Sequence, residues 1–95
     1  MYIKLIKKWQ HNLDLNDWSI DVQPIEREQV TYPDDIGEDK YYIGIATNYQ
    51  KKTGTIYHDV PLYEEAIVHE LLHVKYPNQS EDWVNTISSI ITKLN

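Results

Sequence analysis

The sequence has 95 residues and a formal net charge of −6, and 41% of its residues are hydrophobic. This length predicts one domain spanning residues 1–95, with a core so small that a bound metal would add noticeably to its stability. The acidic excess disfavours nucleic acid as a partner, because a negative surface repels phosphate. Cysteine is absent, which excludes disulfides and thiolate ligands, so any metal must be held by nitrogen and oxygen atoms.

The first segment of the chain combines apolar residues at helical spacing with polar ones. This pattern predicts an amphipathic helix that ends near His11 and Asn12. The lysines interrupt any apolar run of the kind a signal peptide needs, and no segment approaches the length of a membrane span. We therefore expect a soluble, cytoplasmic protein without a membrane partner. The apolar positions are Tyr2, Ile6, Trp9 and Leu13, and the polar positions between them are Lys4, Lys7, Lys8 and Gln10.

Three segments have the pattern of β-strands. Trp18–Val22 alternates apolar and polar residues, and the following Pro24 limits its length. Tyr41–Thr47 and Thr55–His58 predict two strands joined by a polar connection, residues 48–54, of hairpin length. The sequence therefore predicts a small sheet of about three strands, mostly antiparallel.

The segment between the first two predicted strands is polar and shows no sustained period. Residues 26–40 are therefore expected to form a loop, with a short strand near Val30. An acidic run at residues 34–39 is typical of a solvated loop.

Two further helices are expected in the C-terminal half. Pro61 suits the first turn of a helix that runs to about Tyr76, where Pro77 stops it. Ser80, followed by two acidic residues, is typical of the cap and first turn of a last helix that reaches Leu94. The order helix, strands, helix, helix predicts an α+β fold.

Two histidines, His69 and His73, flank Glu70 in the middle of the second of these helices. At 100° per residue all three side chains point into one sector, with only the small Ala66 projecting between them. Apolar residues cover most of the remaining circumference, so we expect a helix that is buried on most sides and carries a polar notch. A single histidine in this position would more often be a core residue. Two of them one turn apart, beside a carboxylate, favour a metal site instead.

The spacing is that of the H-E-x-x-H signature of zinc peptidases, in which two imidazoles reach one zinc ion at about 2.0–2.1 Å. Glu70 can then take a proton from the zinc-bound water and return it to the leaving amine, while the metal polarises the scissile carbonyl. The sequence therefore predicts a zinc endopeptidase with one zinc ion per chain, His69 and His73 as ligands and Glu70 as the catalytic base. The alternative is a catalytically weak zinc-binding module that acts through protein interactions.

A third zinc ligand is expected close behind the motif, where Gln79, Glu81 and Asp82 are the candidates. Glu81 lies at the edge of the apolar stripe of the last helix, whereas Asp82 lies on the side expected to be solvated. We choose Glu81, with Asp82 as the alternative, since Gln79 is a poor metal ligand. An acid in the first turn can also simply stabilise the helix dipole. The stripe consists of Val84, Ile87, Ile90, Ile91 and Leu94.

The stretch from His69 to Val84 resembles the minigluzincins, very small soluble zinc metallopeptidases that keep only the catalytic half of a gluzincin. The H-E-L-L-H motif and the Y-P-N-x-S-E that follows it carry the resemblance, and the order of elements agrees over nearly the whole chain. In that family the two histidines and a glutamate on the next helix hold the zinc ion. The resemblance thus implies a zincin-like fold, with His69, His73 and Glu81 as ligands and Glu70 as general base. We expect peptides or unfolded proteins as substrates.

The motif is also similar to that of SprT-like proteases, in which a P-N-H-S element supplies a histidine as the third ligand. This chain has Gln79 at that place, and the departure, together with the acidic charge, favours the family with a glutamate ligand.

In zincin-type peptidases the strand before the active helix commonly lies antiparallel to the substrate. This implies that residues 41–47 or 55–58 form the rim of the cleft and pair with an extended peptide. His58 could then stabilise the oxyanion, although a strand histidine without such a role is the commoner case.

Overall fold

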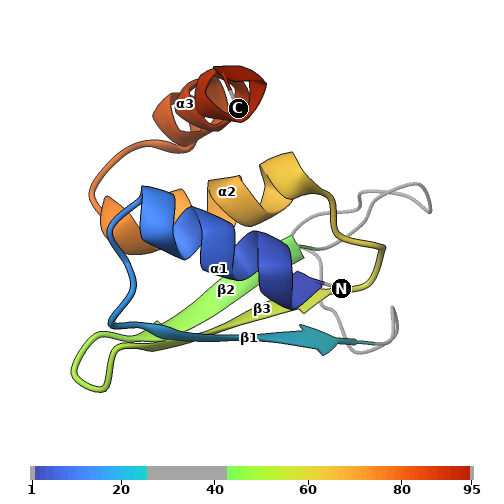
Figure 1. The fold of residues 1–95 in the computed structure, drawn as a ribbon, viewed down its shortest axis with the longest axis vertical. Helices are drawn as coiled ribbons and strands as arrows, with labels where there is room; N and C mark the ends of the chain where they lie inside the picture. Colours follow the sequence, from blue (N-terminus) through green and yellow to red (C-terminus); the bar gives the residue numbers. More distant parts are fainter. Residues whose placement is uncertain (1, 26–42, 95) are drawn as a thin grey trace, which may run out of the picture.

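The computed structural model describes residues 2–25 and 43–94, which form three helices and a three-stranded sheet (Figure 1). The predicted α+β fold is confirmed. The predicted loop at residues 26–40, with its short strand and its acidic run, lies outside the described residues. In chain order the elements are α1 (Tyr2–Asn12), β1 (Ser19–Pro24), β2 (Ile43–Asn48), β3 (Thr53–His58), α2 (Glu64–Lys75) and α3 (Glu81–Leu94).

The sheet has the strand order β1-β3-β2, with β3 in the middle. β2 pairs antiparallel with β3, as the predicted hairpin requires, whereas β1 pairs parallel with β3. The sheet is therefore mixed, and the prediction of a mostly antiparallel sheet is wrong. The alternation of apolar residues indicates which face of a strand is buried, but not which strand lies next to it. The sequence pattern therefore does not determine whether β1 pairs with β2 or with β3. Pro24 ends β1 at an edge of the sheet, where a missing N–H is tolerated.

α1 begins and ends as predicted, with Ile6 and Trp9 buried in the core. Gln10, which the helical pattern groups with the polar face, is instead 1% exposed. Its Nε2 atom donates hydrogen bonds to the carbonyl oxygens of Leu15 at 3.0 Å and Trp18 at 2.7 Å. Gln10 therefore holds the connection between α1 and β1, in which the Leu15 carbonyl oxygen also accepts from the Trp18 N–H at 3.0 Å.

Glu64, in the first turn of α2, ties that helix to α1. Its Oε2 atom accepts hydrogen bonds from Nε1 of Trp9 at 2.7 Å and from Nζ of Lys8 at 3.0 Å. The bond from Trp9, followed by that from Lys8, holds the pKa of Glu64 below its ordinary value. Both donors stabilise the ionised carboxylate of Glu64. Because hydrogen bonds to an ionised group are strong, they hold the N-terminal end of α2 against α1.

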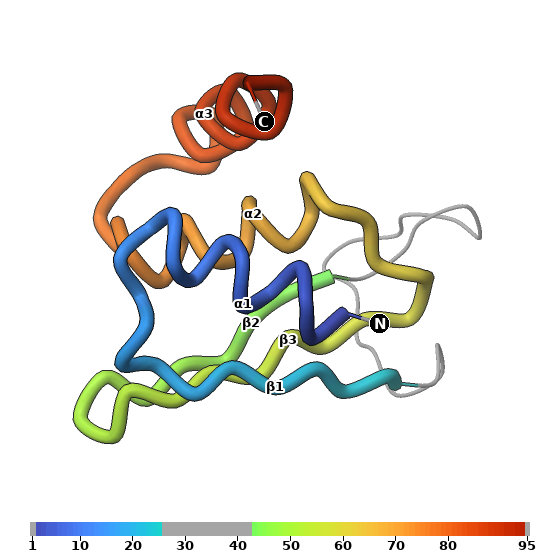
Figure 2. Tube along the Cα trace, viewed as in Figure 1, coloured from blue at the N-terminus to red at the C-terminus, as the bar shows by residue number. Residues whose placement is uncertain are grey.

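The connection from α1 to β1 lies beside the turn between β2 and β3 (Figure 2). The Ser19 N–H donates to the Lys52 carbonyl oxygen at 2.9 Å, and Nζ of Lys52 pairs with the carboxylate of Asp17. This turn spans only residues 49–52, so β2 ends one residue later and β3 begins two residues earlier than predicted, and Lys52 has a φ angle of 55°. The tight turn thus serves as the N-terminal anchor of β1.

α2 begins three residues later than predicted, because the chain is extended as far as Tyr63, whose φ and ψ are −126° and 165°. Leu62 explains the delay. Its side chain is buried in the core at 8% exposure, and its N–H donates to the hydroxyl oxygen of Tyr2 at 3.2 Å. These contacts with the N-terminal part of the molecule need an extended backbone, so Pro61 lies before the helix rather than in its first turn.

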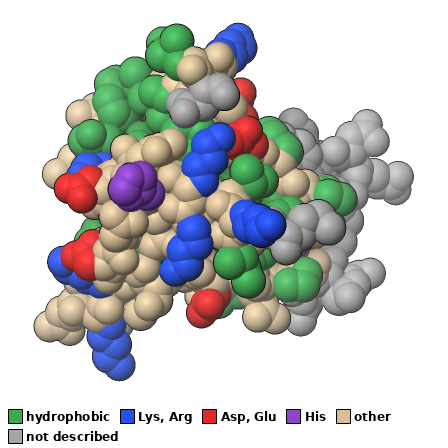
Figure 3. All heavy atoms as spheres, in the orientation of Figure 1, with side chains coloured by type: hydrophobic (Ala, Val, Ile, Leu, Met, Phe, Trp, Pro, Cys, Tyr) green, Lys and Arg blue, Asp and Glu red, His purple; other side chains and the backbone are tan. Residues whose placement is uncertain are grey.

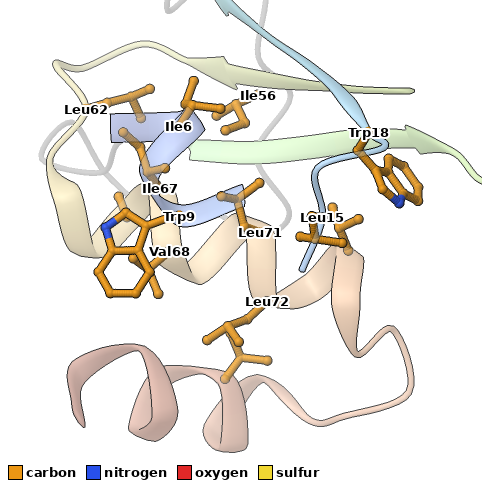
Figure 4. Close-up of a cluster of buried hydrophobic side chains, with 13 residues drawn as sticks. Ile6, Trp9, Leu15, Trp18, Ile56, Leu62, Ile67, Val68, Leu71 and Leu72 are labelled. Carbon is orange, nitrogen blue, oxygen red and sulfur yellow. The ribbon is translucent and has the colours of Figure 1, made fainter. Parts of the chain in front are cut away.

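α2 forms the centre of the core, between the sheet and α3 (Figure 4). Ile67 and Leu71 point to the sheet and Leu72 points to α3, and none of the three is more than 1% exposed. α1 covers part of the same face of the sheet (Figure 1). The predicted burial of this helix on most sides is therefore confirmed. No helix among the described residues has both the length and the apolar character needed to cross a membrane.

α3 packs on α2 on the side away from the sheet (Figure 1). The Trp83 N–H donates to Oγ of Ser80 at 3.1 Å, which confirms the predicted cap. Val84 is fully buried, but Ile90 and Leu94 are 49% and 78% exposed, so the predicted inward stripe is buried only in its first part. Figure 3 shows hydrophobic side chains gathered over α3. The helical period assigns these residues to one face, but a face is buried only where a neighbouring element covers it.

Candidate metal centre

The two histidines of the motif lie one turn apart on α2, and their rings meet edge to face. The ring centroids of His69 and His73 are 4.8 Å apart, and their Nε2 atoms are 3.2 Å apart. The side chains are only 16% and 26% exposed. Packing thus holds both imidazoles in place and leaves their Nε2 atoms directed to a common point.

Glu81, on α3, completes the group. Its Oε1 atom lies 2.7 Å from Nε2 of His69, and its Oε2 atom lies 3.0 Å from Nε2 of His73. The structure therefore brings together the three residues that the sequence predicts as zinc ligands. The alternative ligand, Asp82, is exposed and does not join this group, and Gln79 lies in the exposed turn before α3.

The separations within the group fit a tetrahedral metal ion. Ligand atoms that lie about 2.0–2.1 Å from a tetrahedral zinc ion are about 3.3 Å from one another. The Nε2 atoms of His69 and His73 are 3.2 Å apart, close to that edge length, and one carboxylate oxygen of Glu81 lies within 4.8 Å of both. Two imidazole nitrogens and one carboxylate oxygen are also the donor set of many catalytic zinc sites, in which the fourth position stays open. The residues present therefore fit a zinc ion.

The position of Glu81 follows from the way α3 folds back over α2. Residues 77–80 form the turn between the two helices, and the ring of Tyr76 packs edge to face on Trp83, with centroids 5.3 Å apart. Val84, three residues after Glu81, is fully buried. Because residues three apart share a helix face, Glu81 lies at the edge of the buried face, as predicted.

Glu70 lies next to the group and is only 6% exposed. Burial, and to a smaller extent the negative charge of Glu81, raises the pKa of Glu70 to about 8. A divalent cation nearby would favour the ionised carboxylate. The side chain can therefore gain and lose a proton near neutral pH, which a general base must do.

A cavity of about 230 Å³ opens beside the group, between α2, α3 and the start of β2. Ala66 lines it, and this small side chain leaves the space above the helix open, as the sequence predicts. The other walls are polar in the main. The polar residues are Glu65, Glu70, Asn85 and Ser88, and Ile43 adds apolar surface.

Tyr49, in the turn between β2 and β3, supports the end of α2 that carries His73. Its hydroxyl group donates to the carbonyl oxygen of Val74 at 3.0 Å and lies 3.4 Å from that of His73. The carbonyl groups of a last helical turn lack partners within the helix, so this contact stabilises the turn that holds the ligand. The sequence contains no signal for this role, because Tyr49 lies in a polar connection far from the motif.

His58 does not join the metal centre. It is 8% exposed, its Nδ1 atom donates to the carbonyl oxygen of Val60 at 2.7 Å, and its ring lies edge to face with Tyr2 at 5.8 Å. The residue also does not line the cavity. The structure therefore places His58 in the contact between β3 and α1, and a role in stabilising an oxyanion has no support from this geometry.

No protein-family profile matches the sequence, and no curated protein or solved structure is significantly similar to it. The resemblances to minigluzincins and to SprT-like proteases therefore stay predictions.

Proposed function

We propose that this protein is a zinc-dependent endopeptidase with a minimal zincin-like active site. One observation carries the proposal: His69, His73 and Glu81 bring one ligand atom each to within 4.8 Å of one another, beside the buried Glu70. A bound zinc ion supplies Lewis-acid polarisation of a peptide carbonyl and lowers the pKa of water toward about 7. A structural zinc site is closed by four protein ligands, whereas the described residues supply three, next to a cavity.

Glu70 carries the proton in this reaction. As a carboxylate it accepts a proton from the attacking water, whose oxygen forms a bond to the carbonyl carbon of the substrate. The bond between carbon and nitrogen then breaks, and Glu70 returns the proton to the leaving amine. Its side chain is only 6% exposed but lines the cavity, and its place on α2 next to His69 would keep it beside the metal without binding it.

β2 offers a binding edge for the substrate backbone. β3 is paired on both sides and cannot accept another strand, whereas β2 has a described neighbour only on the β3 side. Ile43, at the start of β2, lines the cavity beside the metal centre. A peptide that adds to the outer edge of β2 would therefore pass along the site in an extended conformation. This geometry favours peptides and unfolded proteins as substrates.

The test compares the wild-type protein with Glu70→Gln and Asp82→Asn, each loaded with zinc, in cleavage of an unfolded protein. Glu70→Gln is expected to keep the metal, since Glu70 is not a ligand, and to cleave at least about 100-fold more slowly. Asp82→Asn removes an equal charge beside Glu81 and is expected to cleave like the wild type. Wild-type turnover by Glu70→Gln would contradict the proposed mechanism. Stoichiometric zinc without cleavage by any of the three proteins would indicate a zinc-binding module that acts through other proteins.

A further inference from the structure

Among the residues that the structure describes, the lining of the cavity beside the metal centre includes three carboxylates, Glu65, Glu70 and Glu81, and no lysine or arginine. A zinc ion with two positive charges would balance Glu70 and Glu81, so that Glu65 contributes the remaining negative charge. Its neighbour Glu64 points elsewhere and is paired with Lys8. The charge that a substrate side chain meets in this cavity is therefore that of Glu65.

Glu65 lies on the same stripe of α2 as the two histidines. It precedes His69 by four residues, which is one turn, or about 6 Å along the helix axis. The side chain is half-buried, and no hydrogen bond or ion pair joins it to another residue in the part of the chain that the structure describes. Its carboxylate can therefore contact a ligand. The separation of Glu65 from the metal ligand His69 is about that between a reacting peptide bond and the end of a neighbouring substrate side chain.

The remaining walls suit a side chain with an apolar stem and a donor at its end. Ile43 and Ala66 provide apolar surface, and Ser88, which is 1% exposed, donates its Oγ hydrogen to the carbonyl oxygen of Asn85 at 3.1 Å. The oxygen of Ser88 is therefore left as an acceptor. The volume of about 230 Å³ is smaller than that of typical small-molecule sites, about 300–1,000 Å³, and fits one side chain better than a whole ligand.

We propose that this cavity binds the basic side chain of a lysine or arginine next to the scissile bond of the substrate, with Glu65 as the specificity-determining residue. This inference rests on the proposed peptidase function. Lysine and arginine combine a methylene stem with end groups that only donate hydrogen bonds. The stem matches the apolar surface of Ile43 and Ala66, and the end group matches the carboxylate of Glu65. An acidic substrate side chain would be repelled by Glu65.

Binding of n-butylammonium, which mimics the end of a lysine side chain, tests the cavity without cleavage. The zinc-loaded protein is titrated with n-butylammonium chloride or with n-butanol at equal chloride, and the amide NMR signals of Ala66 and Ser88 are followed. The cation is expected to bind at least about threefold more tightly, the scale of a partly exposed ion pair. Glu65→Gln should lose this preference. Equal binding of both probes by the wild type, or an unchanged preference in Glu65→Gln, would overturn the inference.

Asp82→Asn is the matched control for this titration. Asp82 and Glu65 both lie in the first turn of a helix, so each substitution has a similar effect on the helix dipole, but Asp82 does not line the cavity. The control should keep the preference for the cation. If Asp82→Asn lost as much of it as Glu65→Gln, only the general charge of the protein would attract the cation, and the assignment to Glu65 would be wrong.

Cleavage of a diverse peptide mixture, with products identified by mass spectrometry, tests the substrate itself. Lysine and arginine should be enriched about three- to tenfold at one position beside the cleaved bond, less so in Glu65→Gln, and Glu65→Lys should favour acidic residues there instead. Cleavage without this preference would overturn the inference and leave the proposed function intact. No cleavage of any peptide would contradict the proposed function, and the butylammonium titration would then decide whether the cavity selects cations.

Discussion

Replacing Glu70 by glutamine in the metal-free protein is expected to remove a large dependence of stability on pH. Burial first, and the charge of Glu81 second, raise the pKa of Glu70 from its ordinary 4.5 to about 8 in the folded protein. The unfolded chain exposes the side chain and so keeps the ordinary pKa. Between these two values the folded protein holds a proton that the unfolded chain has released, so the free energy of unfolding falls as the pH rises. The contribution is complete below pH 4.5 and is lost above about pH 8.

The expected loss follows from the size of the pKa difference. Each pH unit between the two pKa values lowers the free energy of unfolding by about 1.4 kcal/mol, and by less close to either value, which amounts to about 3.5 kcal/mol between pH 5 and pH 8. A small domain is stable by only about 5–15 kcal/mol, so the effect is a large fraction of the total. Glutamine cannot ionise, so Glu70→Gln should lack this loss.

Urea unfolding at pH 5, 6, 7 and 8 in the presence of a chelator, followed by tryptophan fluorescence, measures the difference. Wild type and Glu70→Gln share every other ionisable group, so the difference between their profiles isolates the contribution of Glu70. The exposed Asp82 provides a control, because Asp82→Asn should retain the pH dependence of the wild type. Parallel profiles for wild type and Glu70→Gln would show that burial does not raise the pKa of Glu70.

Three further outcomes are expected. Trp9→Phe removes the hydrogen bond to the Glu64 carboxylate and should lower the free energy of unfolding by about 1–3 kcal/mol in urea titrations; no change would mean that this bond does not stabilise the fold. Ser80→Ala removes the cap of α3 and should cost about 1 kcal/mol in thermal unfolding, with weaker zinc binding because Glu81 starts that helix. Zinc at a free concentration 100 times its Kd should stabilise the wild type by about 2.7 kcal/mol but leave His73→Ala unchanged, which calorimetry can check.

The candidate site could be predicted because its residues lie on two helices. The period of a helix fixes which side chains share a face, so the spacing of His69 and His73 already placed both imidazoles in one sector. The same rule distinguished Glu81 from Asp82, since Val84 three residues after Glu81 anchors the buried face of α3. In each case the decisive geometry is local, and the structure reproduces it.

The arrangement of the sheet depends on contacts that are distant in the sequence. Alternation predicted β1, yet it carries no information about whether β1 pairs with β2 or β3, and the parallel pairing with β3 made the sheet mixed. The start of α2 depends likewise on the contact of Leu62 with Tyr2, 60 residues earlier. Gln10 was misassigned for the same reason, because its partners Leu15 and Trp18 become buried only when the connection folds over α1.

Zinc content per chain tests the metal centre most directly. Protein purified without added metal is analysed for zinc beside His73→Ala, Glu81→Ala and the control Asp82→Asn. The expected result is close to one zinc ion per chain in the wild type and in Asp82→Asn, and little or none in the other two variants, because each removes one of the three convergent ligands. A wild-type protein without zinc, even after zinc is added back, or full zinc content in Glu81→Ala would contradict the assignment of the site.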